Sequence, residues 1–275
     1  MARLRRGRLR WMIAGGVAVA LVVAAVVGWP YLQRYTGSAP PPQFYDKVQR
    51  EPALARDYPR VLGVAHNAGN NLGTLSTALH YGADVIEIDV ISARGHLVAG
   101  RDQPWGWLAR QLFRGPTLVQ AWDAAAAAGI VKLDLKQTDR GFLDDLVAFL
   151  APRAGSRRVM ISSRDSSALL YLHSRLPDVT MLFSVAGPDA VHQLKSDSVL
   201  QKAIGGVSVF HGLVDANLVT WVHAHRLVIL AWTVNDSERF NLLVRLGVDG
   251  ITTDNLAILR TLGRPAATPL ERQDG

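Results

Sequence analysis

Short runs of apolar, often β-branched residues alternate with segments of helical composition from residue 60 to residue 262. Eight of these runs have the length of strands, and they cover residues 61–66, 83–90, 130–136, 158–163, 179–185, 206–210, 227–234 and 250–253. The helical segments between them include residues 74–81, 142–151, 166–176, 216–225 and 238–246. A further short run, residues 96–100, follows the second strand and predicts a hairpin extension. Strands that alternate with helices predict parallel pairing through right-handed crossovers.

The count of eight strands favours an α/β fold, a closed (β/α)8 TIM barrel somewhat smaller than the usual size of about 250 residues. An open, doubly wound sheet is the competing architecture. No glycine-rich dinucleotide fingerprint follows the first strand, which weakens that alternative. The pattern therefore predicts one barrel domain over residues 60–262.

The segment before the barrel carries a different pattern. Residues 11–29 contain no charged side chain, and a helix of that length spans about 28 Å, close to the thickness of a bilayer core. A cleaved signal peptide is the alternative, but its apolar stretch is usually only about 7–15 residues long. No clear cleavage site follows the run, so we favour an uncleaved transmembrane anchor over residues 11–32. The arginines before it predict a cytoplasmic N-terminus, a cell-membrane location and an extracytoplasmic barrel.

The predicted organisation is a basic cytoplasmic segment (1–10), the anchor (11–32), a proline-containing linker (33–59), the barrel (60–262) and a C-terminal tail (263–275). The formal net charge of +7 comes largely from five arginines in the basic segment. The rest of the chain carries 25 basic and 23 acidic residues, which argues against nucleic-acid binding. The absence of cysteine excludes disulfides, thiolate zinc sites and cysteine nucleophiles.

Polar residues gather at the predicted C-terminal ends of the strands, where TIM barrels place their functional sites. They are His66, Glu87, Asp89, Asp134, Lys136, Ser163, Arg164, His211, Trp232, Thr233, Asn235 and Asp254. Residues two apart on a strand share a face, so Glu87 and Asp89 should point the same way, and so should Asp134 and Lys136.

Three carboxylates, Glu87, Asp89 and Asp134, should therefore converge at the barrel mouth. Carboxylates held together in a low-dielectric site raise one another's pKa unless a cation lies between them. Oxygen-only donors favour a divalent cation, Mg²⁺ or Ca²⁺, over zinc. The alternative is a salt network in which Lys136 and nearby arginines balance the acids.

Four segments carry a family resemblance. Residues 82–90, Gly-Ala-Asp-Val-Ile-Glu-Ile-Asp-Val, resemble a signature of the glycerophosphodiester phosphodiesterase family, and residues 132–136, 231–235 and 247–254 resemble its later strands in the family's order. The resemblance implies a TIM-barrel phosphodiesterase with a cation held by Glu87, Asp89 and Asp134. It also implies catalytic roles for His66 and Lys136. Trp232 and Asn235 match the family's Trp-Thr-Val-Asn strand and become substrate-binding candidates.

The chain departs from the family pattern around the first histidine. The family's His-Arg-Gly is replaced by His66-Asn67-Ala68, and Asn70 stands where a glutamate is usual. The first loop is short and the third acid is Asp134 rather than glutamate, features that resemble the sphingomyelinase D branch of the superfamily.

Arg101 stands where the family has its second catalytic histidine. A guanidinium cannot exchange protons at neutral pH, although it can bind a phosphate through two oxygens. Arg101 is therefore a substrate-binding candidate, and His211, at the end of the sixth strand, is a candidate substitute for the lost histidine.

Two function classes remain open. One is a membrane-anchored phosphodiesterase acting on a glycerophosphodiester or a lipid-derived phosphodiester. The other is a degenerate barrel that binds a phosphodiester or lipid headgroup without hydrolysing it, which Arg101 favours. A purely structural anchored domain leaves the converging carboxylates unexplained. Residues 103–114, with two tryptophans and two arginines, suit either a bilayer interface or packing across the barrel mouth.

Overall fold

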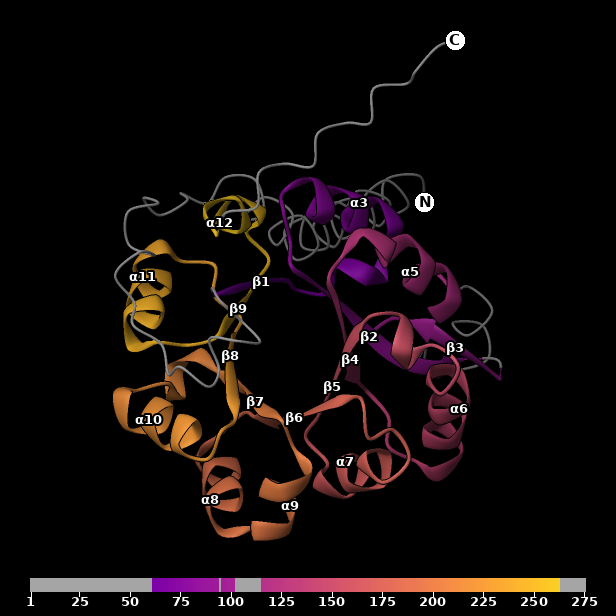
Figure 1. Cartoon of the computed structure of the whole chain (residues 1–275). Helices are drawn as coiled ribbons and strands as arrows, with labels where there is room; N and C mark the ends of the chain where they lie inside the picture. The colour runs from indigo at the N-terminus through magenta and orange to yellow at the C-terminus, as the bar shows by residue number, and fades with distance from the viewer. Residues whose placement is uncertain (1–60, 94, 102–114, 263–275) are drawn as a thin grey trace, which may run out of the picture.

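The computed structural model describes residues 61–93, 95–101 and 115–262, and these form a closed barrel (Figure 1). Its eight parallel strands are β1 (Leu62–Ala65), β2 (Val85–Ala93), β4 (Ile130–Leu135), β5 (Arg158–Ser163), β6 (Thr180–Val185), β7 (Gly206–Phe210), β8 (Val228–Trp232) and β9 (Gly250–Thr253). Neighbours in the chain are neighbours in the barrel, and β1 pairs with both β2 and β9 to close it. The predicted TIM barrel is confirmed.

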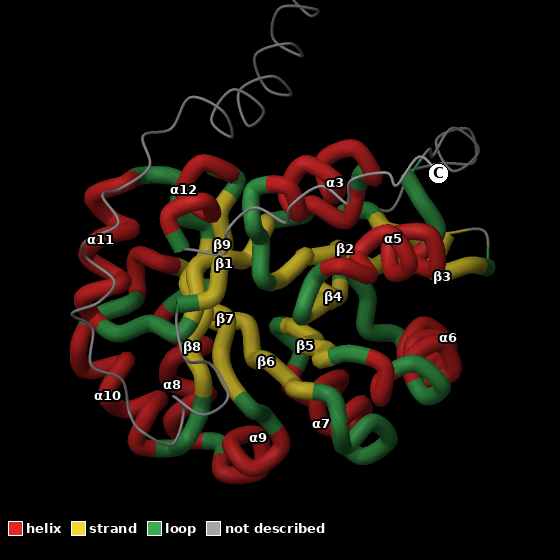
Figure 2. Tube along the Cα trace, turned by 45° about the horizontal axis from the view of Figure 1, so that its top comes forward, coloured by secondary structure: helices red, strands yellow, loops and turns green. Residues whose placement is uncertain are grey.

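Helices form a ring outside the strands (Figures 1 and 2). They are α3 (Leu72–His80), α5 (Leu118–Ala124), α6 (Arg140–Leu150), α7 (Ser166–His173), α8 (Pro188–Ser196), α9 (Ser198–Ala203), α10 (Ala216–Ala224), α11 (Ser237–Leu246) and α12 (Leu256–Thr261). Several begin at an aspartate whose carboxylate accepts backbone N–H groups of the first turn, as Asp139 does for α6 and Asp165 for α7. These caps start the helices soon after each strand ends.

The predicted hairpin is also present. β3 (His96–Ala99) pairs antiparallel with the outer part of β2, which continues to Ala93, beyond the predicted end of that strand. Gly95 supplies the turn with a φ of 73°, a conformation that suits glycine. The hairpin projects from the barrel edge (Figure 1) and does not take part in closing it.

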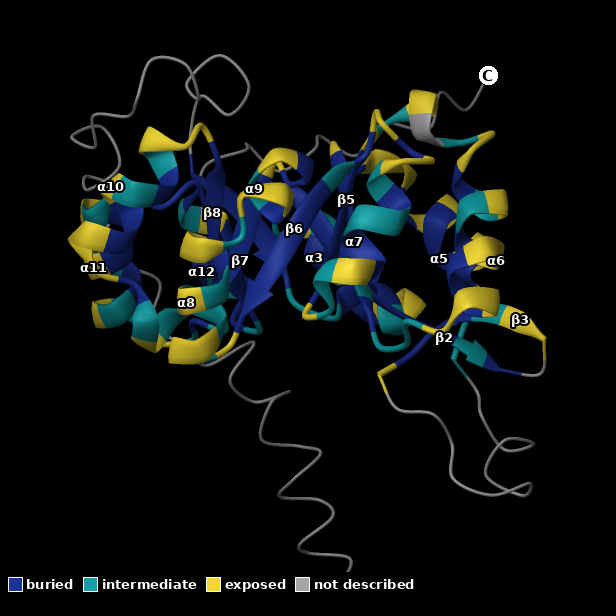
Figure 3. Ribbon diagram, turned by 90° about the horizontal axis from the view of Figure 1, so that it is seen from below, coloured by how far each residue is buried: buried dark blue, intermediate teal, exposed yellow. Residues whose placement is uncertain are grey.

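The inside of the barrel has two chemically different halves. Near the N-terminal ends of the strands, inward-facing side chains form an apolar cluster made of Leu62, Val64, Val85, Ile130, Met160, Leu182, Val228 and Leu230. Towards the C-terminal ends the same faces become polar. On β2, for example, Val85 is followed on the same face by Glu87 and Asp89. A larger apolar core fills the space between strands and helices, and the buried strands stand out in Figure 3.

Gly206 lies at the apolar end of β7, where the barrel has no room for a side chain. An added Cβ would come within 2.3 Å of Val228 Cγ2 and 2.6 Å of its carbonyl oxygen. We therefore expect Gly206→Ala to lower the free energy of unfolding by about 1–3 kcal/mol, measured by urea denaturation. Gly155→Ala is the matched control, because an added Cβ there meets nothing within 4 Å. Equal stability of the two variants would contradict this account of the packing.

Within the described residues, no helix is both long enough and apolar enough to cross a membrane. The segments predicted as basic N-terminus (1–10), anchor (11–32), linker (33–59) and tail (263–275) lie outside those residues, as do residues 102–114. Their predicted roles stay predictions.

Candidate active site

A cavity of about 480 Å³ opens at the C-terminal ends of the strands. The side chains that line it come from widely separated parts of the chain and are mostly polar. They are His66, Glu87, Arg101, Lys132, Asp134, Leu135, Lys136, Gln137, Thr138, Ser163, Arg164, Asp165, Ser184, Ser208 and Trp232. The apolar cluster described above fills the barrel interior nearer the N-terminal ends of the strands. The cavity is thus the polar half of the barrel interior.

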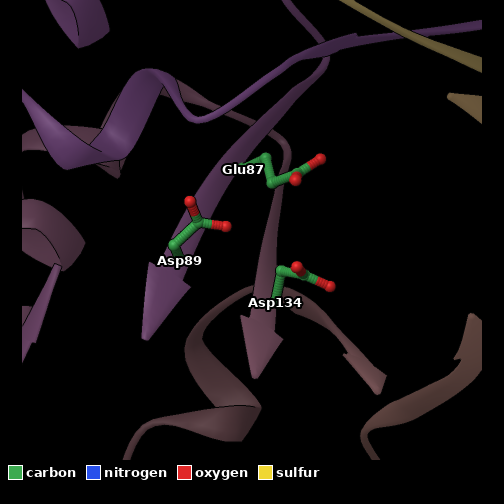
Figure 4. A group of neighbouring side chains, drawn as sticks. All are labelled: Glu87, Asp89 and Asp134. Atoms are coloured by element: carbon green, nitrogen blue, oxygen red, sulfur yellow. The ribbon is translucent and has the colours of Figure 1, made fainter. Parts of the chain in front are cut away.

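Three carboxylates meet on one side of this cavity. Asp89 and Asp134 are register partners on the neighbouring strands β2 and β4, and Glu87 lies one inward position below Asp89. One oxygen from each of the three lies within 4.8 Å of the others. Figure 4 shows them projecting from the two strands towards the same space. Asp89 and Glu87 are buried, and Asp134 is partly exposed.

Two lysines contact these acids. Lys136 Nζ lies 2.9 Å from Asp89 Oδ1 and also donates to Asp134. Burial alone would raise the pKa of Asp134, but the charges of Lys132 and Lys136 and the hydrogen bonds it accepts from Lys136 and Ser162 hold that pKa below its usual value. Burial alone would lower the pKa of Lys136, but its contacts with Asp134 and Asp89 raise it. Both groups are therefore held in their charged forms at neutral pH.

The residues that depart from the family pattern also contact Asp89. Asn70 Nδ2 donates to Asp89 Oδ2 at 2.9 Å, and the Asp89 backbone N–H donates to Asn70 Oδ1 at 2.9 Å. In the amide orientation that satisfies both ends of its side chain, Asn67 donates to Asp89 Oδ2 at 2.9 Å and accepts from His66 Nε2 at 3.2 Å. Asn67 adopts a left-handed conformation with a φ of 52°, which asparagine tolerates better than most residues. The two asparagines therefore hold Asp89 in place.

His66 directly follows β1 and is held by a residue from the other end of the barrel sequence. Its Nδ1 lies 2.8 Å from Asp254 Oδ1, and Asn235 Nδ2 donates to the other Asp254 oxygen at 3.1 Å. Burial alone would lower the pKa of His66. The hydrogen bond to Asp254 and the negative charges of Glu87, Asp254 and Asp89 outweigh burial and raise it above its usual value of 6.5.

Asp254→Asn should therefore lower the pKa of His66 in protein kept free of metal by a chelator. The measurement is an NMR titration of the His66 ring signals, assigned with a His66→Gln variant. The raised pKa of His66 adds to the free energy of unfolding. This contribution is fully present below pH 6.5 and is lost as the pH rises through the raised pKa. The wild type should therefore lose its stability advantage over Asp254→Asn in that pH window. An unchanged His66 pKa in the variant would contradict this role of Asp254.

The structure brings most of the predicted site residues together. Asp89 lies buried behind the cavity in the carboxylate cluster. The cavity is lined by six of the predicted residues, His66, Glu87, Arg101, Asp134, Lys136 and Trp232. Asn235 contacts Asp254, so it positions the partner of His66 and is not itself among the described lining residues.

His211 is placed differently from the other predicted site residues. It follows β7 in a short 3₁₀ helix (His211–Leu213), packs against the Phe210 ring, and is absent from the described lining of the cavity. Burial and the nearby Arg239 lower its pKa. Its predicted role in place of the second histidine gains no support from this position.

Two charged contacts of the site were not predicted. Lys132 lies on β4 opposite Glu87, and its Nζ is 3.1 Å from Glu87 Oε2. The available signal was its spacing, since it lies two residues before Asp134 and must share its face. Asp254 was recognised as a strand-end residue, but its pairing with His66 joins β1 to β9 across 188 residues of sequence, and no local pattern shows such a contact.

The donor set suits a hard divalent cation. Three carboxylates with ligand atoms within 4.8 Å of one another match the preference of Mg²⁺ and Ca²⁺ for oxygen ligands. The two lysines that contact these acids bear charges that a cation would have to tolerate. Glu87, Asp89 and Asp134 are thus the residues that could hold a metal.

The closed barrel and the carboxylate-lined cavity at the C-terminal ends of its strands define a TIM-barrel protein with its site in the usual place for enzymes of that fold. The model of the glycerophosphoryl diester phosphodiesterase family matches residues 120–258, just over half of the chain. This chain belongs to that family, whose members are phosphoric diester hydrolases, and the resemblance found in the sequence motifs is confirmed.

A curated relative agrees with the family match. Glycerophosphodiester phosphodiesterase GDPD4 of Arabidopsis thaliana is 24% identical over 124 residues, which is 45% of this chain and 37% of that protein. The matched stretch therefore spans little more than a third of the relative. The likeness to the sphingomyelinase D branch stays a prediction.

Solved structures show the same fold. A phosphodiesterase of Oleispira antarctica, in complex with the product sn-glycerol-3-phosphate, is 20% identical with a TM-score of 0.61, over 73% of this chain and 96% of that one. Glycerophosphodiester phosphodiesterase of Thermotoga maritima is 17% identical with a TM-score of 0.59, over 74% and 99% of the two chains. At these identities the likeness supports the barrel architecture alone.

Proposed function

We propose that this protein is a metal-dependent phosphodiesterase that hydrolyses a glycerophosphodiester or a lipid-derived phosphodiester. The observation that carries the proposal is one cavity lined by His66 together with a cluster of three carboxylates whose ligand atoms lie within 4.8 Å of one another. A histidine held by a carboxylate can serve as nucleophile or general acid–base in phosphodiester hydrolysis, and a hard cation can stabilise the charge on the phosphoryl oxygens.

Each described residue has a role in this proposal. Glu87, Asp89 and Asp134 hold Mg²⁺ or Ca²⁺, which when bound neutralises negative charge on the phosphoryl oxygens. His66 is oriented by Asp254 through Nδ1, so Nε2 is the ring nitrogen that faces the substrate, as nucleophile or as general acid–base. The amide of Asn67 contacts Nε2 at 3.2 Å and would give way to the substrate.

The cavity offers two further surfaces to a diester. Lys136 and Arg101 are cationic and suit the phosphate oxygens. Next to the acids around the barrel, the successive strands β5, β6 and β7 contribute the hydroxyl groups of Ser163, Ser184 and Ser208. Hydroxyls of this kind can donate to and accept from a polyol, which supports a glycerol group on that side.

The test is hydrolysis by the purified full-length chain. Glycerophosphocholine and glycerophosphoglycerol would be incubated with Mg²⁺ or Ca²⁺ and with excess chelator, and release of glycerol phosphate would be measured. We expect release that depends on the added cation. Release that is unaffected by the chelator would remove the metal from the proposal, and no release from either diester would contradict the function.

A second candidate is a barrel that binds a phosphodiester without hydrolysing it, because Arg101, which cannot exchange protons, lines the cavity where the family has a histidine. Arg101→His distinguishes the two. If the wild-type protein hydrolyses the diester and the substitution adds little activity, the protein is an enzyme. If the wild-type protein binds the diester without hydrolysing it and the variant hydrolyses it, the protein is a binding domain.

Membrane attachment is a separate part of the proposal. It is supported by the charge-free segment 11–29 and the five arginines before it, which are typical of a single-pass anchor with a cytoplasmic N-terminus. An anchored barrel outside the cytoplasm would meet diesters released from lipids. Protease added to intact cells should then digest the barrel, whereas protection until the membrane is opened would contradict this orientation.

A further inference from the structure

Lys132 is a buried ammonium in the part of the barrel that the proposed function assigns to a metal. Lys132 is only 2% exposed and lies on the inward face of β4. It lines the cavity together with Glu87. The Nζ is 3.1 Å from Glu87 Oε2, and the two residues are register partners on adjacent strands. A lysine buried to this extent is rare unless a carboxylate compensates its charge.

The chain supplies a donor to every carboxylate of the cluster. Glu87 has Lys132, while Asp89 has Lys136 and the amide of Asn70. Asp134 accepts hydrogen bonds from Lys136 and Ser162. The two ammonium groups balance two of the three negative charges, and the amide and hydroxyl donors satisfy further carboxylate oxygens, so the cluster can remain folded without any bound ion.

The side chain of Lys132 has less freedom to move than that of Lys136. Lys136 is 23% exposed in its side chain, lies at the rim of the cavity and can turn towards solvent or phosphate. Lys132 is enclosed by the barrel wall, so its charge stays close to Glu87 whatever else binds. An ion that binds Glu87 would have to share this carboxylate with the ammonium and tolerate a positive charge at short range in a low-dielectric site.

We propose that Lys132 is a built-in competitor of the divalent cation, which weakens metal binding at Glu87 and keeps the carboxylate cluster stable when no metal is bound. The inference rests on the proposed function for the identity of the site, and it adds a property of this chain's own residues. It makes two linked predictions, one for metal affinity and one for metal-free stability.

Neutralising Lys132 should have opposite effects on these two quantities. Lys132→Met should bind Mn²⁺ about tenfold more tightly than the wild type, or better, because the competing charge is gone. The same variant should melt at a lower temperature in chelator, because Glu87 is left buried without a partner, and Mn²⁺ should restore more of its melting temperature than it adds to the wild type.

The experiment uses the full-length chain in detergent, with Mn²⁺ as the probe. Isothermal titration calorimetry and electron paramagnetic resonance measure Mn²⁺ affinity, and thermal melts measure stability. Lys132→Gln is the second variant, since its amide can still donate to Glu87 without a charge and so preserves folding if the methionine does not. Lys132→Arg keeps the charge and should bind Mn²⁺ no better than the wild type. Lys202→Met, at an exposed lysine of α9, is the matched control and should change neither quantity.

The outcomes separate this inference from the proposed function. Tighter Mn²⁺ binding by the methionine or glutamine variant, but not by the arginine variant, supports the inference even if no diester is hydrolysed. Equal or weaker binding by both neutral variants overturns it, even if the wild type is an active hydrolase. Wild type and variants that all fail to bind Mn²⁺ overturn it as well.

Discussion

Asp134→Asn should reduce kcat/KM for a glycerophosphodiester by about 10²- to 10³-fold and weaken Mn²⁺ binding in parallel. The substitution keeps the shape of the side chain, its oxygen can accept from Lys136 in place of Oδ2, and its amide can donate to the Ser162 hydroxyl in place of Oδ1, so the barrel should fold. It removes one of the three negative charges that would hold the cation, whose stabilisation of the phosphoryl oxygens is worth several kcal/mol. Steady-state kinetics at saturating and limiting Mn²⁺ measure the effect.

Asp139→Asn is the control for this substitution. Asp139 follows the same strand, is exposed, and caps α6 by accepting from the backbone of Phe142, a role that asparagine fills equally well. Its activity and Mn²⁺ affinity should match the wild type. Asp134→Asn with unchanged metal affinity would show that the carboxylate cluster does not hold the ion.

His66→Ala should reduce kcat by about 10²- to 10⁴-fold, the range expected on losing a group that transfers protons. KM should change much less, because the cationic side chains that bind phosphate remain. Mn²⁺ affinity should not fall, since the ring lies outside the three-carboxylate ligand set. Single-turnover kinetics with a diester and Mn²⁺ titrations of the same variant separate the chemical step from metal binding.

His96→Ala supplies the comparison. His96 is exposed on β3, in the hairpin that projects from the barrel. Its removal should leave kcat unchanged. A similar loss of activity in both variants, or full activity in His66→Ala, would exclude His66 as the catalytic histidine.

The barrel could be predicted from sequence because its determinants are local and periodic. Each strand is a short apolar run, and three of them, β5, β7 and β9, begin and end at the predicted residues. Other strand ends differ from the prediction, as in β2, which runs on to Ala93 because β3 pairs with it. The alternating inward face placed the three acids together for the same reason.

The contacts between distant elements could not be predicted in this way. Asp254 reaches His66 only because the barrel closes between β9 and β1, and closure is a property of the whole sheet. Asn67 and Asn70 appeared in the sequence as departures from a family pattern, and the structure shows that they contact Asp89.

His211 shows the limit of reading site residues from strand ends. Its ring lies beside Phe210 in a turn that Arg239 braces by donating to backbone carbonyls. Position at a strand end was therefore not sufficient to bring a side chain into the cavity. Arg101 stands as the residue that lines the cavity in the region where the family has its second histidine.

The apolar cluster in the lower barrel also governs the passage of molecules. Tightly packed leucines, isoleucine, valines and methionine leave no path through the centre of the domain. The diester substrate and its two products, an alcohol and a phosphate monoester, would therefore enter and leave through the same opening at the C-terminal ends of the strands. Slow departure of the monoester would block entry of the next diester, so accumulating product would itself restrain the rate of turnover.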